Sequence, residues 1–157
     1  SRASVQEIIQ TACQTVELAA MKKEIVIAAD SKAAEGLTCY ADRKWTIEAV
    51  ANVIENAVKY SPESSAIEIS VVPYEIFICI QIKDRGIGIR EEEQGLVFRR
   101  FYRSKDVKDS TGYGIGLYLV REVLSKQGGY VKIQSEYGKG TIVSLYFLRS
   151  CWISGIQ

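Results

Sequence analysis

The chain has 157 residues, of which 47% are apolar and 25% charged, and its formal net charge is +1. This composition is that of an ordinary globular protein and excludes a disordered chain. The near-zero charge argues against general nucleic-acid binding through a basic surface. We expect one domain over residues 1–150, a tail at 151–157, and a monomer in isolation that binds no nucleic acid.

The cysteines, the absence of histidine and the apolar runs restrict the chemistry. Cys13, Cys39, Cys79 and Cys151 are widely spaced without a C-x-x-C pair, which indicates a reducing, cytosolic setting. No apolar run approaches the roughly 18 residues that cross a bilayer, so we expect no membrane contact by this segment and any anchor to lie outside it. Without histidine, the chain supplies neither an imidazole base nor a phosphorylatable imidazole.

The first sixty residues predict two helices separated by short strands. Apolar residues recur at helical spacing over residues 4–21, and segments 24–29 and 37–40 are typical of short strands around a glycine turn. Asp42 is a suitable N-cap for the second helix. Pro62 ends this helix because proline disfavours helix in the residue before it.

The rest of the chain predicts four strands and a third helix. Residues 66–72 alternate as in a half-buried strand, and residues 75–83 are nearly continuously apolar, as in a central strand. A helix opens in the glycine-rich segment 112–117, and strands follow at 130–136 and 141–148. This order predicts an α/β two-layer sandwich, in which a mixed sheet of about five strands is covered on one face by about three helices.

The second helix carries a narrow polar stripe. At about 100° per residue, Asn52, Asn56 and Lys59 lie within roughly 60° of one another, opposite an apolar face. Two carboxamides and an ammonium could hold a metal and phosphates. The alternative is a solvated helix face.

An Asp-x-Gly-x-Gly turn ends the central strand. The carboxylate of Asp84 can accept a hydrogen bond from an exocyclic amine, and Gly86 and Gly88 leave room for a flat ring against the backbone. This combination fits adenine. The alternative is a common turn capped by aspartate.

The glycine triplet Gly112-x-Gly114-x-Gly116 opens a helix, where exposed N–H groups favour an anion. Its spacing is not that of a dinucleotide fingerprint. The alternative is a loop-to-helix junction without a ligand.

Residues 90–111 are charged and irregular, which indicates a lid over a site. The lid has basic residues and two phenylalanines, Phe98 and Phe101, that could anchor it. The alternative is a solvated run of charge.

Along the chain, the motifs come in the order polar-striped helix, Asp-x-Gly-x-Gly turn, lid, glycine triplet and a final Gly-x-Gly-Thr hairpin. In this order they resemble the catalytic, ATP-binding domain of sensor histidine kinases, in the wider family that includes gyrase-type, Hsp90-type and mismatch-repair ATPases. The resemblance spans residues 4 to 148. It implies a Bergerat-type sandwich with ATP and Mg²⁺ between the helices and the lid.

The resemblance also implies roles for individual residues. Asn56 matches the family's magnesium-binding asparagine, and Asn52 matches the asparagine beside it in the same sequence motif. Lys59 matches a lysine that contacts the phosphates. Tyr60 matches the aromatic residue that flanks the nucleotide, and Asp84 matches the adenine-binding aspartate. The catalytic residues implied are Asn56, Lys59 and Arg103, and the other nucleotide contacts implied are Gly86, Gly88, Ile89, Phe98, Phe101, Gly112, Gly114, Ile115, Gly116, Leu117 and Thr141.

The family resemblance implies a domain that donates a phosphoryl group from ATP but lacks the histidine that accepts it. Relatives that hydrolyse ATP carry a glutamate four residues before the magnesium asparagine, where this chain has Asn52. The expected activity is therefore transfer to a histidine on a separate dimerisation and phosphoacceptor domain of a membrane-anchored parent, with a response regulator downstream. The alternatives are a nucleotide-responsive binding module without phosphotransfer and an ATPase of the same family.

Overall fold

The computed structural model describes residues 1–100, 102 and 116–150. In chain order, the elements are β1 (Arg2–Ser4), α1 (Val5–Lys22), β2 (Val26–Ala29), α2 (Ser31–Ala34), β3 (Thr38–Tyr40), α3 (Arg43–Tyr60), β4 (Ala66–Pro73), β5 (Phe77–Asp84), the 3₁₀ turn η1 (Glu91–Glu93), α4 (Leu117–Lys126), β6 (Tyr130–Glu136) and β7 (Gly140–Leu148).

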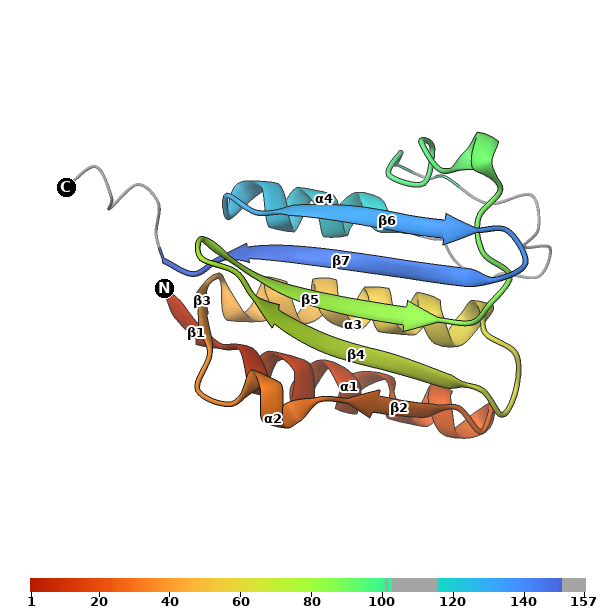
Figure 1. The fold of residues 1–157 in the computed structure, drawn as a ribbon, viewed down its shortest axis with the longest axis horizontal. Coiled ribbons are helices and arrows are strands. Elements are labelled where there is room, and N and C mark those ends of the chain that lie inside the picture. The colour runs from red at the N-terminus through yellow and green to blue at the C-terminus, as the bar shows by residue number, and fades with distance from the viewer. Residues whose placement is uncertain (101, 103–115, 151–157) are drawn as a thin grey trace.

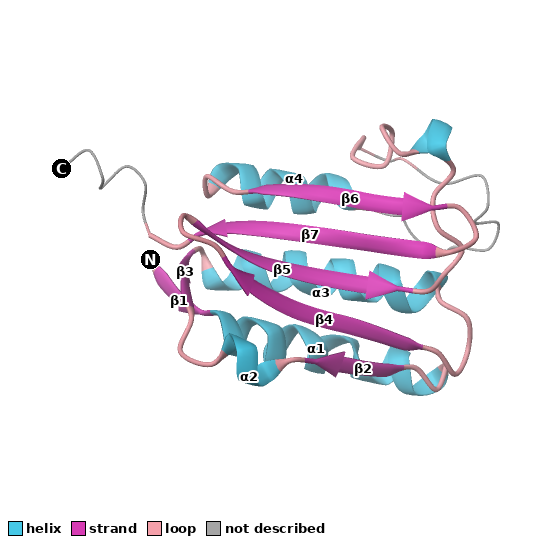
Figure 2. Ribbon diagram, viewed as in Figure 1, coloured by secondary structure: helices cyan, strands magenta, loops and turns pink. Residues whose placement is uncertain are grey.

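These elements form a two-layer α/β sandwich, which confirms the predicted fold class. The main sheet has five strands in the order β2-β4-β5-β7-β6, and β5 is its central strand as predicted. Its first two strands are parallel and its other neighbours are antiparallel, so the sheet is mixed. The long helices α1, α3 and α4 lie on one face of this sheet, with α3 behind its middle strands (Figures 1 and 2).

Local signals explain the two long helices. The Ser4 hydroxyl accepts the Glu7 N–H at 3.2 Å and caps α1, while the Asp42 carboxylate accepts the Trp45 N–H at 3.1 Å and caps α3, as predicted. Each helix buries the apolar stripe seen in its sequence, including Ile8 of α1. Burial of these stripes against the sheet forms the core of the sandwich.

The two short strands that follow α1 belong to different sheets. The sequence predicts strands at 24–29 and 37–40 around one turn, but β2 begins at Val26 and pairs in parallel with β4. The short helix α2 follows, capped by Asp30, whose carboxylate accepts the Ala33 N–H at 3.1 Å. Strand β3 pairs with β1, a strand of three residues that is too short to show alternation in sequence.

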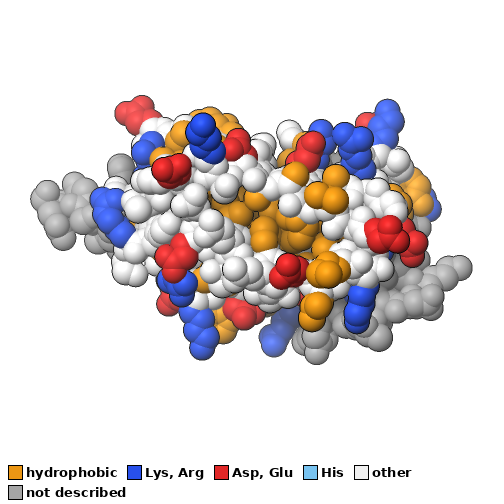
Figure 3. All heavy atoms as spheres, turned by 90° about the horizontal axis from the view of Figure 1, so that it is seen from below, with side chains coloured by type: hydrophobic (Ala, Val, Ile, Leu, Met, Phe, Trp, Pro, Cys, Tyr) orange, Lys and Arg blue, Asp and Glu red, His pale blue; other side chains and the backbone are white. Residues whose placement is uncertain are grey.

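Charge is distributed without a single dominant sign over the face seen in Figure 3, where acidic and basic side chains are interspersed. Among the residues that the structure describes, no helix has both the length and the apolar character to cross a membrane.

Candidate functional site

A pocket opens between α3 and the sheet, beside the point where β5 ends. It contains about 550 Å³ of space, which includes open solvent at its mouth. The pocket is lined by Val53, Asn56, Ala57, Tyr60, Ile82, Asp84, Ile87, Gly88, Ile89, Leu117, Thr141 and Val143. Most of this wall is apolar, and a few polar groups converge on it.

Asp84 is the charged residue among the described residues of the pocket wall. It stands opposite Thr141 in the β5–β7 ladder and two residues after the buried Ile82, so its side chain lies on the helix-facing side of the sheet. Its Oδ1 accepts the Gly86 N–H at 2.8 Å, and the Thr141 N–H also donates to the carboxylate. Burial raises the pKa of Asp84 above its ordinary value, although these two N–H donors act in the opposite direction.

The glycines of the turn after Asp84 are required by contacts between protein segments. A Cβ on Gly86 would lie 2.4 Å from the Tyr60 carbonyl oxygen, and a Cβ on Gly88 would lie 2.3 Å from that of Glu136. Gly88 also has φ +73°, a conformation that favours glycine. The turn is therefore packed between the end of α3 and the β6–β7 hairpin. Gly88 lines the pocket, whereas Gly86 is not among the described residues of the pocket wall.

The polar stripe of α3 is divided between two environments. Asn56 lines the pocket, whereas the Asn52 Nδ2 donates to the Gly116 carbonyl at 2.8 Å. Gly116 precedes α4 with φ +63°, so Asn52 connects α3 to the start of α4. The half-buried Lys59 has its Nζ 5.8 Å from the centre of the Tyr60 ring, and Tyr60 forms part of the wall.

Of the other expected nucleotide contacts, some line the pocket and others do not. Ile89, Leu117 and Thr141 line it. Phe98 is half-buried against the core, with the Arg121 guanidinium 5.6 Å from its ring centre, and does not line the pocket. The expected contacts Phe101, Arg103, Gly112, Gly114 and Ile115 lie outside the described residues.

Several residues of the site have no polar signature in the sequence. The apolar wall residues Val53, Ala57, Ile82 and Val143 follow the ordinary core pattern, although Ile82 and Val143 each lie two residues from a polar wall residue on the same strand face. Ile87, which also lines the pocket, lies in the glycine turn and is exposed.

Two polar side chains form hydrogen bonds with the backbone N–H and carbonyl groups of Ile89. The Ser135 hydroxyl accepts the Ile89 N–H at 2.8 Å, and the Gln94 amide donates to the Ile89 carbonyl at 3.0 Å. These bonds fix the segment after the glycine turn against the β6–β7 hairpin.

Comparison with known proteins agrees with this architecture. Residues 41–150 match the model of the family described as histidine kinase-, DNA gyrase B- and HSP90-like ATPases. The chain belongs to this family. Its curated relatives are sensor histidine kinases, and a solved catalytic domain of a histidine kinase shares its fold.

Among curated relatives, the sensor-like histidine kinase SenX3 of Mycobacterium tuberculosis is 33% identical over 143 residues, which cover 90% of this chain and 34% of SenX3. The sensor histidine kinase YxdK of Bacillus subtilis is 38% identical over 113 residues, which cover 69% of this chain and 34% of YxdK. The chain thus spans about a third of the length of these kinases.

Solved structures share the fold of the ATPase-family domain. The catalytic domain of histidine kinase ThkA, crystallised without nucleotide, superposes with a TM-score of 0.80 at 21% identity and covers 95% of this chain and 97% of its own. Full-length ShkA in complex with AMPPNP superposes with a TM-score of 0.80 at 20% identity, covering 94% of this chain and 30% of ShkA.

Proposed function

We propose that this catalytic domain binds Mg-ATP in the pocket between α3 and the sheet and donates the γ-phosphoryl group to a histidine on a separate domain. The observation that carries the proposal is Asp84, a half-buried carboxylate on an otherwise mainly apolar wall. A carboxylate there can accept a hydrogen bond from the exocyclic amine of adenine, while guanine presents a carbonyl at the equivalent position.

The residues of the wall fit an adenine ring. Apolar side chains from α3 and from the sheet face each other across the pocket, among them Ala57, Ile82 and Val143. They can cover the two faces of a planar base, and the Asp84 carboxylate supplies the acceptor at its edge. Tyr60 and Thr141, which also line the pocket, provide further polar groups beside the base.

The polar end of the site would hold the metal and phosphates. The amide oxygen of Asn56 is a hard neutral ligand that suits Mg²⁺, and Lys59 and Arg103 would contact the phosphates. The segment 112–117 would offer backbone N–H groups before α4, and residues 90–111 would form the lid over the nucleotide. When bound, Mg²⁺ would neutralise charge on the transferring phosphoryl group.

The acceptor must come from elsewhere, since the chain has no histidine. We propose that it lies on a dimerisation and phosphoacceptor domain of the same parent, with a response regulator downstream. We also propose that the domain lies on the cytoplasmic side of a membrane-anchored kinase. A neutral imidazole needs little help from a general base, and Asn52 supplies none.

The proposal is tested by comparing nucleotide affinity in wild type and Asp84→Asn. The substitution should weaken ATP binding by about 1.5–3 kcal/mol, the range for one hydrogen bond to a charged group. It should have little effect on GTP binding. Calorimetric titration in Mg²⁺ measures both. Unchanged ATP affinity would contradict the adenine role of Asp84.

Phosphotransfer is tested separately by incubating the domain with γ-labelled ATP and a purified phosphoacceptor domain. Labelled histidine should appear with wild type and be lost in Asn56→Ala. Tight ATP binding without transfer would instead support the alternative of a nucleotide-responsive module.

A further inference from the structure

Lys23 makes an unusually complete set of contacts with the end of α3. This residue follows the last residue of α1, and its Nζ donates to the carbonyl oxygens of Val58 at 2.9 Å, Lys59 at 3.1 Å and Ser61 at 2.7 Å. An ammonium has three donors, so all of them are used. The accepting carbonyls belong to the last turn of α3 and its C-cap, where helices leave carbonyl groups without intrahelical partners.

The same turn of α3 supports the pocket. Asn56 and Tyr60 line it, and the Tyr60 carbonyl is the group against which Gly86 packs. The Gly86 N–H in turn donates to Asp84 at 2.8 Å. A continuous series of contacts therefore runs from Lys23 through the end of α3 and the glycine turn to the Asp84 carboxylate.

Charge gives Lys23 a second effect on the site. The C-terminal end of a helix carries about half a negative charge, concentrated on its last carbonyls. Such a charge is unfavourable beside a polyanionic nucleotide. The Lys23 ammonium offsets it at three of these carbonyls, because it binds them directly.

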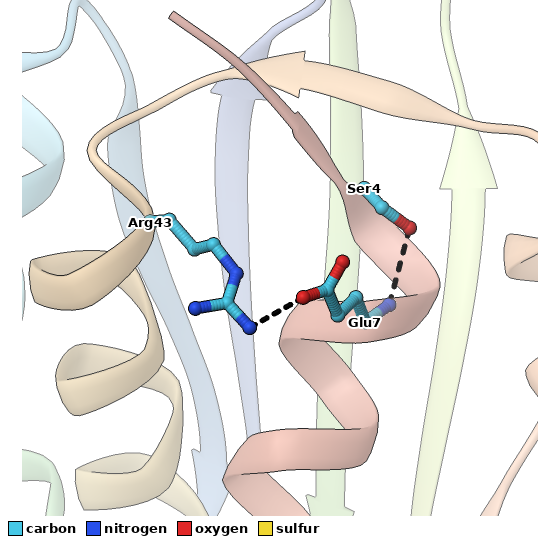
Figure 4. Close-up of polar contacts among 3 residues, drawn as sticks. All are labelled: Ser4, Glu7 and Arg43. Carbon is cyan, nitrogen blue, oxygen red and sulfur yellow. Dashed lines mark hydrogen bonds and ion pairs between the residues drawn. The ribbon is translucent and has the colours of Figure 1, made fainter.

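The other end of the α1–α3 pair offers a comparison. There the Arg43 guanidinium forms an ion pair with the Glu7 carboxylate, just after the Ser4 cap (Figure 4). Both side chains of this pair are about half exposed, at 54% and 53%, and exposed pairs of this kind contribute little. The two helices are thus linked at both ends, but only the Lys23 link adjoins the pocket.

We propose that Lys23 is a positioning residue for nucleotide binding. It fixes the last turn of α3, and through that turn it sets the position of Tyr60 and of the Gly86 turn that orients Asp84. This inference rests on the proposed nucleotide site. It predicts that removing the ammonium weakens nucleotide binding in molecules that remain folded.

The test uses Lys23→Met, which keeps most of the aliphatic stem, and two matched controls. Lys22→Met makes the same change at the exposed neighbouring position in the last turn of α1. Glu7→Gln removes the link at the far end of the two helices. Calorimetric titration with Mg-ADP gives the dissociation constant and the stoichiometry for each protein.

We expect Lys23→Met to raise the Kd roughly tenfold, comparable to weakening one charged hydrogen bond to Asp84, at a stoichiometry near one. Lys22→Met and Glu7→Gln should stay within about twofold of wild type. A purely structural role would lower the stoichiometry through loss of folded protein and leave the Kd unchanged, which would overturn the proposal.

A second measurement covers the case in which Lys23→Met fails to fold. Lys23→Arg keeps the charge and donors but changes their geometry, so it should fold, bind with an intermediate Kd and show faster hydrogen exchange at the Gly86 amide than wild type. The proposal would be overturned if Lys23→Met were unfolded while Lys23→Arg matched wild type in both hydrogen exchange and nucleotide affinity. Lys23 would then contribute only to stability. If wild type itself bound no Mg-ADP, the proposed nucleotide site would be wrong, which is a distinct outcome.

Discussion

Replacing Gly86 by alanine tests how the glycine turn holds Asp84 in place. The added Cβ would lie 2.4 Å from the Tyr60 carbonyl oxygen and 2.9 Å from its carbon. Both are backbone atoms, so no flexible side chain can move aside. An ordinary contact is about 1 Å longer, and either the turn or the end of α3 must shift by that amount. Overpacking of this kind costs about 1–3 kcal/mol of unfolding free energy.

The same shift should weaken nucleotide binding, because Gly86 N–H is a hydrogen-bond donor to Asp84. Displacing the carboxylate by about 1 Å would remove most of one charged hydrogen bond to adenine. The binding free energy would fall by about 1.5–3 kcal/mol, which raises the Kd roughly 10- to 150-fold. Urea denaturation gives the stability change, and titration with Mg-ADP gives the affinity change.

Gly95→Ala is the matched control for this substitution. A Cβ on Gly95 has no atom within 4 Å, and its φ lies outside the positive range, so alanine should change the free energy of unfolding by less than about 0.5 kcal/mol. If Gly86→Ala matched Gly95→Ala in stability and wild type in affinity, the packing of the turn against α3 would not control the site.

Two further predictions concern Asp84 and Asn52. Because burial raises the Asp84 pKa in the folded state, the folded protein binds more protons than the unfolded chain between the ordinary value of about 3.9 and the raised one. The stability of wild type relative to Asp84→Asn should therefore fall as pH rises through this window, and urea denaturation from pH 4 to 7 measures it; a rise would contradict the sign. The nucleotide affinity of wild type should instead rise with pH over this window, because the protonated carboxyl binds adenine less well. Asp84→Asn should show no such pH dependence of affinity. Asn52→Asp removes the donor to the Gly116 carbonyl and places a carboxylate beside it, so it should lower the free energy of unfolding by about 1–3 kcal/mol. Wild-type stability of Asn52→Asp in urea denaturation would show that this link between α3 and α4 is unimportant.

Much of the fold follows from local patterns. The helical spacing of α3 and its Asp42 cap predict an amphipathic helix because both depend on neighbouring residues. The alternation in β4 and the apolar run of β5 likewise predict their places in the sheet. The ordered motifs resemble sensor-kinase catalytic domains closely enough to indicate the family.

Partners distant in sequence are beyond the reach of such patterns. The sequence places Asn52 on a polar stripe, but its hydrogen bond is made to Gly116, 64 residues away. Gly86 suggests room for a ligand, whereas its missing side chain makes room for the Tyr60 carbonyl. Periodicity determines which face of a helix or strand is apolar, but it does not specify which backbone group another segment brings to that face.

The sequence by itself thus determined the three long helices, most of the strands and the residue types suited to a nucleotide site. Only the tertiary structure decided that β2 joins β4 in parallel, that α3 and α4 are linked through Asn52, and that Lys23 binds the end of α3. The physical reason is that secondary structure depends mainly on local conformational preference and hydrophobic period. Strand pairing and the satisfaction of helix-end carbonyls depend on which distant polar groups meet when the core is buried.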